Sequence, residues 1–88
     1  MDSQLLRDKY PSIGPCLVPP FERPCFQGIY RYAALVLAQR GSVVLFAAET
    51  TRQFGVGLLD SEGHVSESDQ YPSFEMAARV FLLHPHAD

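Results

Sequence analysis

The sequence has no tryptophan, only one lysine and only two cysteines among its 88 residues. Its longest apolar stretches, 32–38 and 43–48, are far shorter than the ~20 residues that cross a bilayer. The first residues carry mixed charges and lack the apolar run of a signal peptide. We therefore expect a cytoplasmic protein without a membrane segment.

An excess of positive charge is also missing. The formal net charge is −3 and the isoelectric point is near 5.5, which weighs against binding nucleic acid through its phosphates. The charge is uneven, at +2 for residues 1–40 and −5 for residues 41–88. Six of the seven basic residues are arginine, a bias that GC-rich bacterial genomes produce. The second half should therefore present an acidic surface.

Known catalytic and cofactor motifs are absent from the sequence, which has no glycine-rich phosphate loop, no H-E-x-x-H and no G-x-S-x-G. Cys16, Cys25, His84 and His86 together offer a zinc donor set. Eight residues separate the cysteines and one separates the histidines, and neither spacing matches known zinc motifs. No sequence signature surrounds either cysteine as a nucleophile. We therefore expect no enzymatic activity, no metal and no cofactor.

The redox state of the two cysteines stays open at this point. A cytoplasm would keep Cys16 and Cys25 reduced. A disulfide would have to close a loop that contains Pro19, Pro20 and Pro24, and its geometry cannot be derived from sequence.

Composition predicts a folded chain, because 47% of the residues are hydrophobic and 19% are charged. At 88 residues the chain should form one small domain with a thin core. We expect residues 1–28, which hold five of the seven prolines, to form an irregular arm packed on the body or on a partner. Within this arm, Ser3 to Lys9 should form a short helix. Residues 29–88 should form a single α+β domain.

Residues 29–40 fit two structures. The run from Ala33 to Arg40 consists mostly of helix formers, and Gly41 stands where a helix-ending glycine belongs. Conversely, Tyr30, Tyr32 and Val36 favour a strand, with Arg40 and Gly41 as a hairpin turn. The balance favours the helix.

The remainder predicts three strands and a helix. The strands are expected at 43–46, 53–59 and 64–70, with a turn at 60–63. Two glycines on one face of the second strand, Gly55 and Gly57, indicate close packing by a backbone or an aromatic ring. The fold class is therefore α+β, with an antiparallel meander of three or four strands and a C-terminal helix packed on one face.

The apolar spacing after Ser73 predicts that helix, with Ser73 as its N-cap. Its buried face should consist of Phe74, Ala78, Phe81 and Leu82. We expect these side chains to contact Val44, Phe46, Val56 and Leu58, or the opposite-face neighbours of these residues if the strand register differs.

For function we expect a small non-catalytic protein-binding module, which acts as a homodimer or as an adaptor or inhibitor of a larger bacterial protein. Aromatic residues near element ends make good interface anchors, unless they simply cap the core. These candidates are Phe21, Phe26, Tyr30, Tyr32 and Tyr71.

The alternative is a nucleic-acid-binding module that uses the basic N-terminal half. Its candidate basic patch comprises Arg7, Lys9, Arg23, Arg31 and Arg40.

Overall fold

The computed structural model describes residues 3–27, 29–48 and 51–84. It contains a short helix, a 3-10 helix, five strands and a C-terminal helix. In chain order these are α1 (Ser3–Lys9), η1 (Pro11–Cys16), β1 (Leu17–Gln27), β2 (Tyr30–Arg40), β3 (Val43–Ala48), β4 (Gln53–Leu59), β5 (Val65–Tyr71) and α2 (Phe74–Leu82).

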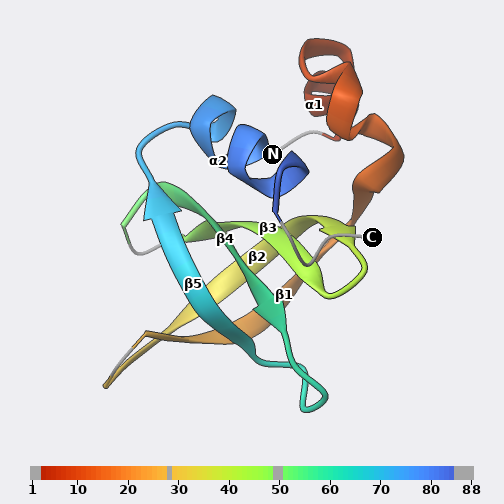
Figure 1. Ribbon diagram of the computed structural model, residues 1–88. Coiled ribbons are helices and arrows are strands. Elements are labelled where there is room, and N and C mark those ends of the chain that lie inside the picture. The colour runs from red at the N-terminus through yellow and green to blue at the C-terminus, as the bar shows by residue number, and fades with distance from the viewer. Residues whose placement is uncertain (1–2, 28, 49–50, 85–88) are drawn as a thin grey trace.

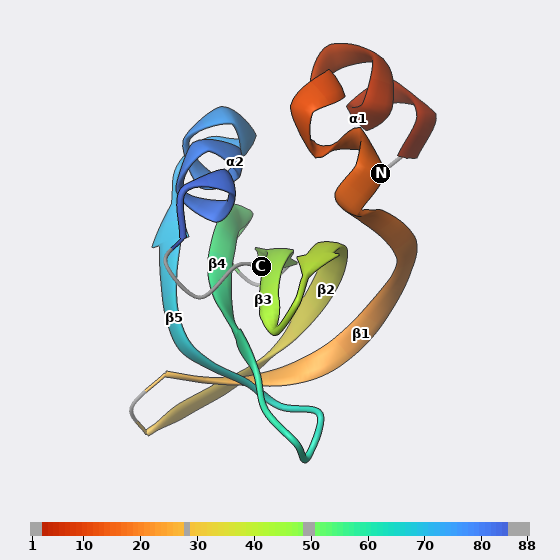
Figure 2. The ribbon, with the colours of Figure 1, turned by 45° about the vertical axis from the view of Figure 1, so that its right-hand side comes forward.

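The five strands form a closed barrel in the order β1-β2-β3-β4-β5. Consecutive strands are antiparallel, and a single parallel pairing of Cys25 with Val65 joins β1 to β5. Both helices lie at one end of the barrel, whereas the β1–β2 hairpin and the β4–β5 turn project at the other end (Figures 1 and 2). The α+β class, the antiparallel sheet and the C-terminal helix are as predicted, but the sheet has five strands instead of three or four.

The N-terminal region is more regular than predicted. The expected helix at Ser3–Lys9 is present, but Leu17–Gln27, expected to be irregular, form the strand β1. Proline is tolerated in a strand at a bulge or where its missing N–H faces no neighbour. Pro19 and Pro20 lie where the β1–β2 register shifts, between Leu17 and Phe21. Burial of apolar β1 side chains inside the barrel outweighs the weak strand propensity of this segment.

The helix favoured for residues 29–40 is wrong, because Tyr30–Arg40 form the strand β2. This strand pairs with β1 on one edge and β3 on the other, and Ala34, Val36, Leu37 and Ala38 are all buried. A strand buried on both faces has a nearly continuous apolar sequence, which resembles a buried helix. Gly41, with a φ of 62°, supplies the hairpin turn into β3.

The barrel wall separates two apolar clusters. The interior cluster combines residues from β1, β2, β3 and β5, namely Cys25, Ala34, Val36, Val44, Phe46, Ala48 and Val65. The outer cluster lies between the sheet and the helices, and comprises Leu6, Ile13, Leu37, Ala38, Val43, Leu45, Val56, Phe74, Ala77, Ala78 and Phe81. Among the residues that the structure describes, no helix is long and apolar enough to cross a membrane.

Helix α2 begins as predicted, because the Ser73 hydroxyl accepts a hydrogen bond from the backbone N–H of Met76 at 3.2 Å. Its buried face belongs to the outer cluster together with Val56 and Leu58, two of its expected neighbours. The other two, Val44 and Phe46, point into the barrel interior instead. Alternation along β3 places Val43 and Leu45 under the helix in their stead.

Gly55 and the Phe46 ring account for the close packing expected on β4. A Cβ atom at Gly55 would lie 2.6 Å from Cε2 of Phe46 and closer still to Cζ. Phe46 is fully buried, so its ring has little room to move. Gly55 has no side chain, and this leaves the room that the Phe46 ring, the largest side chain of the interior cluster, occupies.

We expect Gly55→Ala to destabilise the fold by about 1–3 kcal/mol, because the added methyl group overpacks the barrel interior. Gly14→Ala is the matched control, since a Cβ there would meet only Cγ of Arg7 at an ordinary 3.4 Å. Urea unfolding of both variants measures the difference. Equal midpoints for the two variants would contradict the packing assignment.

We expect Phe81→Ala to cost about 3–5 kcal/mol, because Phe81 is fully buried in the outer cluster. Leu83→Ala, one residue beyond the same helix and 77% exposed, should change stability by no more than about 0.5 kcal/mol. Thermal unfolding monitored by circular dichroism compares the two variants. A folded Phe81→Ala variant with an unchanged midpoint would contradict this prediction.

Candidate functional site

The outer face of the β1–β2 hairpin carries the residues that best fit a binding surface. Phe26 and Arg31 are cross-strand partners, and the Arg31 guanidinium carbon lies 5.4 Å from the centroid of the Phe26 ring. The His64 ring meets Phe26 edge-on, with centroids 4.9 Å apart. Glu62 Oε2 lies 3.7 Å from Nδ1 of His64. We call Arg31, Phe26, His64 and Glu62 the exposed row.

The β4–β5 turn positions its half of the exposed row. Asp60 Oδ1 accepts hydrogen bonds from the backbone N–H groups of Glu62 and His64, both at 2.9 Å. This is the Asx-turn geometry expected for aspartate at a tight turn. Gly63, with a φ of 80°, supplies the left-handed residue that the turn requires. The turn predicted from sequence at 60–63 is thereby confirmed.

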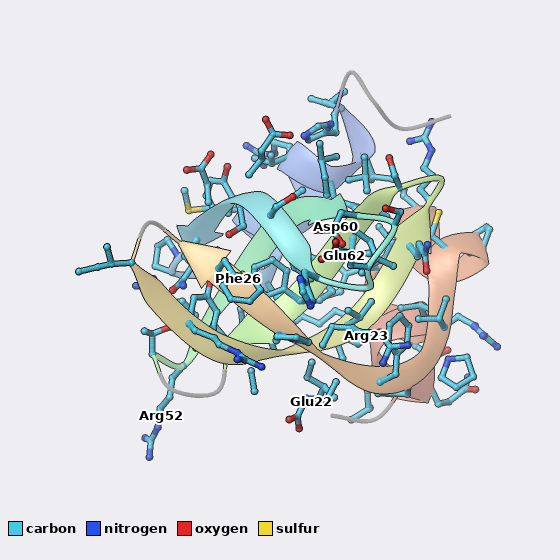
Figure 3. All side chains as sticks on the ribbon, turned by 90° about the horizontal axis from the view of Figure 1, so that it is seen from below. Glu22, Arg23, Phe26, Arg52, Asp60 and Glu62 are labelled. Carbon is cyan, nitrogen blue, oxygen red and sulfur yellow. The ribbon has the colours of Figure 1, made fainter. Side chains whose placement is uncertain are left out.

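The hairpin also exposes apolar side chains. Phe26 is 37% exposed, and Ile29 is 93% exposed. Figure 3 views this end of the barrel and shows Phe26 and Arg23 on β1, close to the turn that carries Asp60 and Glu62. Arg52, on the β3–β4 turn, lies apart from them. Aromatic and aliphatic side chains beside charged groups are therefore available to a partner.

A surface hollow of about 380 Å³ lies beside the row. It is lined by Glu22, Arg23, Pro24, Arg31, Tyr32 and Ala33. The Arg23 guanidinium stacks 4.9 Å from the centroid of the Phe21 ring and donates to the backbone carbonyl of Glu22 at 3.1 Å. Two of the predicted basic residues, Arg23 and Arg31, thus border one depression.

Polar side chains close the barrel next to this surface. Gln70 Nε2 donates to the Tyr32 hydroxyl at 2.7 Å, and the Thr51 hydroxyl donates to Gln70 Oε1 at 2.8 Å. The Cys25 thiol and the Ser68 hydroxyl are 3.3 Å apart. Burial raises the pKa of Tyr32 above its ordinary 10.0, and the neighbouring Cys25 thiol adds to the rise.

Of the five predicted interface aromatics, Phe26 is the one that the structure places in the exposed row. Phe21 and Tyr32 pack against the interior cluster, and Tyr71 packs against the outer cluster. Tyr30 begins β2, but its side chain lies outside the part of the chain that the structure describes. The reading of these rings as caps on a small core therefore fits Phe21, Tyr32 and Tyr71.

The five predicted basic residues do not form one patch. Arg7 and Lys9 lie on α1, at the helical end of the barrel (Figure 1). Arg23 and Arg31 line the hollow beside the opposite end. Arg40 donates to the carbonyl of Leu82 at 3.0 Å, where α2 ends. The positive charges are therefore divided among three places.

Three residues of this surface were not selected from the sequence: Ile29, Glu62 and His64. In sequence, Glu62 and His64 are indistinguishable from ordinary turn residues. Ile29 lies between two strands of a hairpin, where exposed residues are common. This position could not be recognised while residues 29–40 were expected to form a helix.

Both cysteines are free thiols, with Cys25 buried and Cys16 partly buried. Within residues 3–27, 29–48 and 51–84, no group of three potential metal ligands comes together. His86 lies outside these residues. No family model, no curated protein and no solved structure matches this chain.

The raised pKa of Tyr32 predicts a loss of stability at high pH. The stability gained by keeping the phenol protonated is complete below its unfolded pKa, and it is lost as the pH rises through the folded pKa. Urea midpoints of the wild-type chain should therefore fall as the pH rises above the ordinary tyrosine pKa of 10.0. Tyr32→Phe should show a smaller fall, although Tyr71, whose pKa is also raised by burial, still contributes. Equal falls in both chains would contradict the prediction.

Proposed function

We propose that this chain is a small non-catalytic protein-binding module that contacts its partner through the outer face of the β1–β2 hairpin and the β4–β5 turn. The observation that carries the proposal is Phe26, a half-exposed ring held between Arg31 and His64. Arginine and aromatic side chains are enriched at the centres of protein interfaces.

The packing of this surface supports binding at low entropic cost. The Phe26 ring already contacts the Arg31 guanidinium and the His64 ring, so it loses little rotamer freedom when a partner covers it. Ile29 adds apolar area at the turn of the same hairpin, since its side chain is almost fully exposed. A packed aromatic ring and an exposed aliphatic residue on one hairpin provide the anchor and the apolar area that protein-binding sites use.

The nucleic-acid alternative has weaker support. Binding to a phosphate backbone needs several cations along one continuous track. Here Arg7 and Lys9 are separated from Arg23 and Arg31 by the length of the barrel, and Arg40 is bonded to the end of α2 (Figure 1).

A capture experiment tests the proposal. Tagged wild-type chain, Ile29→Asp and Met76→Asp are incubated with extract of the organism that encodes the protein, and retained proteins are quantified by mass spectrometry. Ile29→Asp should reduce retention at least about tenfold, the effect of about 1.4 kcal/mol, because a carboxylate would be buried in the interface. Met76→Asp is the control, since Met76 is also exposed, at 46%, but lies on α2.

Equal retention by all three chains would contradict the proposed surface. Binding of a fluorescent single-stranded oligonucleotide, measured by anisotropy at two salt concentrations, distinguishes the nucleic-acid-binding function from the protein-binding one. Tight binding that weakens steeply with salt would favour the nucleic-acid function over the one proposed.

A further inference from the structure

The exposed row has opposite charges at its two ends. It begins with the Arg31 guanidinium, continues through the rings of Phe26 and His64, and ends with the Glu62 carboxylate. A two-fold rotation through the middle of such a row exchanges its ends. The cation of each copy would then face the carboxylate of the other, with the rings between them, which is the self-complementarity that an isologous interface requires.

Neither end of the row is neutralised by a strong internal ion pair. Among the residues that the structure describes, no carboxylate lies within 4.0 Å of the Arg31 guanidinium, which stacks on Phe26. Glu62 is 77% exposed, and its neighbour His64 is charged only when protonated. Both end groups are therefore available to bind a group of opposite charge on another molecule.

From this order of charges we infer that the partner bound by the exposed row is a second copy of the chain, in a two-fold symmetric dimer. The inference rests on the proposed protein-binding function and names its partner. Arg31 of one protomer pairs with Glu62 of the other, twice, while the two Phe26 rings exclude water near the axis.

Contact between the β5 strands of two copies is the competing geometry, and the charges on this strand oppose it. The exposed carboxylates of Glu67 and Asp69 on that strand would repel the same strand of a second copy. Glu67 also has a φ of 50°, at the irregularity in the β4–β5 pairing, so β5 is not a regular strand there. The exposed row, in contrast, presents both signs of charge.

A stable dimer would bury more of the chain's surface than the four side chains of the exposed row. An interface of standard size takes about 800 Å² from each partner, roughly a seventh of the 5295 Å² that this chain exposes. The row spans β1, β2 and the β4–β5 turn, and the exposed Ile29 side chain of the same hairpin adds to its area.

Charge reversal tests the arrangement directly. Arg31→Glu places carboxylates at both ends of the row, and Glu62→Arg places cations at both ends. Each variant should repel its own copies and raise the dimer dissociation constant at least about tenfold, measured by light scattering over a concentration series. Mixing the two variants should restore association, because each end then faces its opposite. The double variant Arg31→Glu with Glu62→Arg should also dimerise.

Arg79→Glu is the control, because it reverses an exposed arginine on α2 without touching the row. It should leave the dissociation constant unchanged. A wild-type monomer at all concentrations, or two variants that fail to associate on mixing, would overturn the dimer. A monomer that still captures another protein through Ile29 would overturn the dimer alone. Loss of both self-association and capture would overturn the proposed function as well.

Discussion

The closure of the barrel between β1 and β5 is the constraint on which the rest of this structure depends. Every other strand pair shares several register positions, whereas β1 and β5 meet at the single pair Cys25 and Val65. Beyond this pair, side-chain contacts connect the strands on either side of the junction. The contacts of Tyr32 with Gln70, and of Cys25 with Ser68, join the two sides of the seam. These partly buried polar groups are thereby hydrogen-bonded, and burial of the Tyr32 phenol raises its pKa.

The same closure creates the exposed row. Because Cys25 pairs with Val65, the next residue of β1, Phe26, lies beside the residue that precedes β5, His64. The β1–β2 register then places Arg31 across from Phe26. A shift of one residue in the β1–β5 register would turn Phe26 to the other face of the sheet, and Phe26 would then lose its contact with His64. The order of charges along the row is therefore a consequence of strand register, although its residues lie far apart in the sequence.

Local signals in the sequence were sufficient for much of the fold and for little of the site. The Ser73 cap, the Gly63 turn and the Gly55 packing position each depend on a few neighbouring residues, and all three are present in the structure. The strands β1 and β2 depend on partners far along the chain. Pro24 and the run around Leu37 contradict strand formation locally, and only burial against the rest of the barrel resolves the conflict.

The candidate surface could not be derived from sequence because the β1–β2 register and the seam between β1 and β5 bring its members together. Phe26 was selected for its aromatic ring and Arg31 for its charge, as candidates for two different functions. The structure places them in one contact, with the guanidinium on the ring. The basic and aromatic residues at this end of the barrel therefore belong to one surface.

The division between interior and surface also explains how the exposed row can differ from the residues that stabilise the fold. Phe46 fills the space beside Gly55 in the interior cluster, and Phe81 fills the space beneath α2 in the outer cluster. A large aromatic side chain therefore packs each of the two clusters. The exposed row uses residues that neither cluster contains. Surface substitutions of this kind usually change stability by no more than about 0.5 kcal/mol. Charge at the row can consequently be reversed without unfolding the barrel, because the side chains that stabilise the barrel are not those of the exposed row.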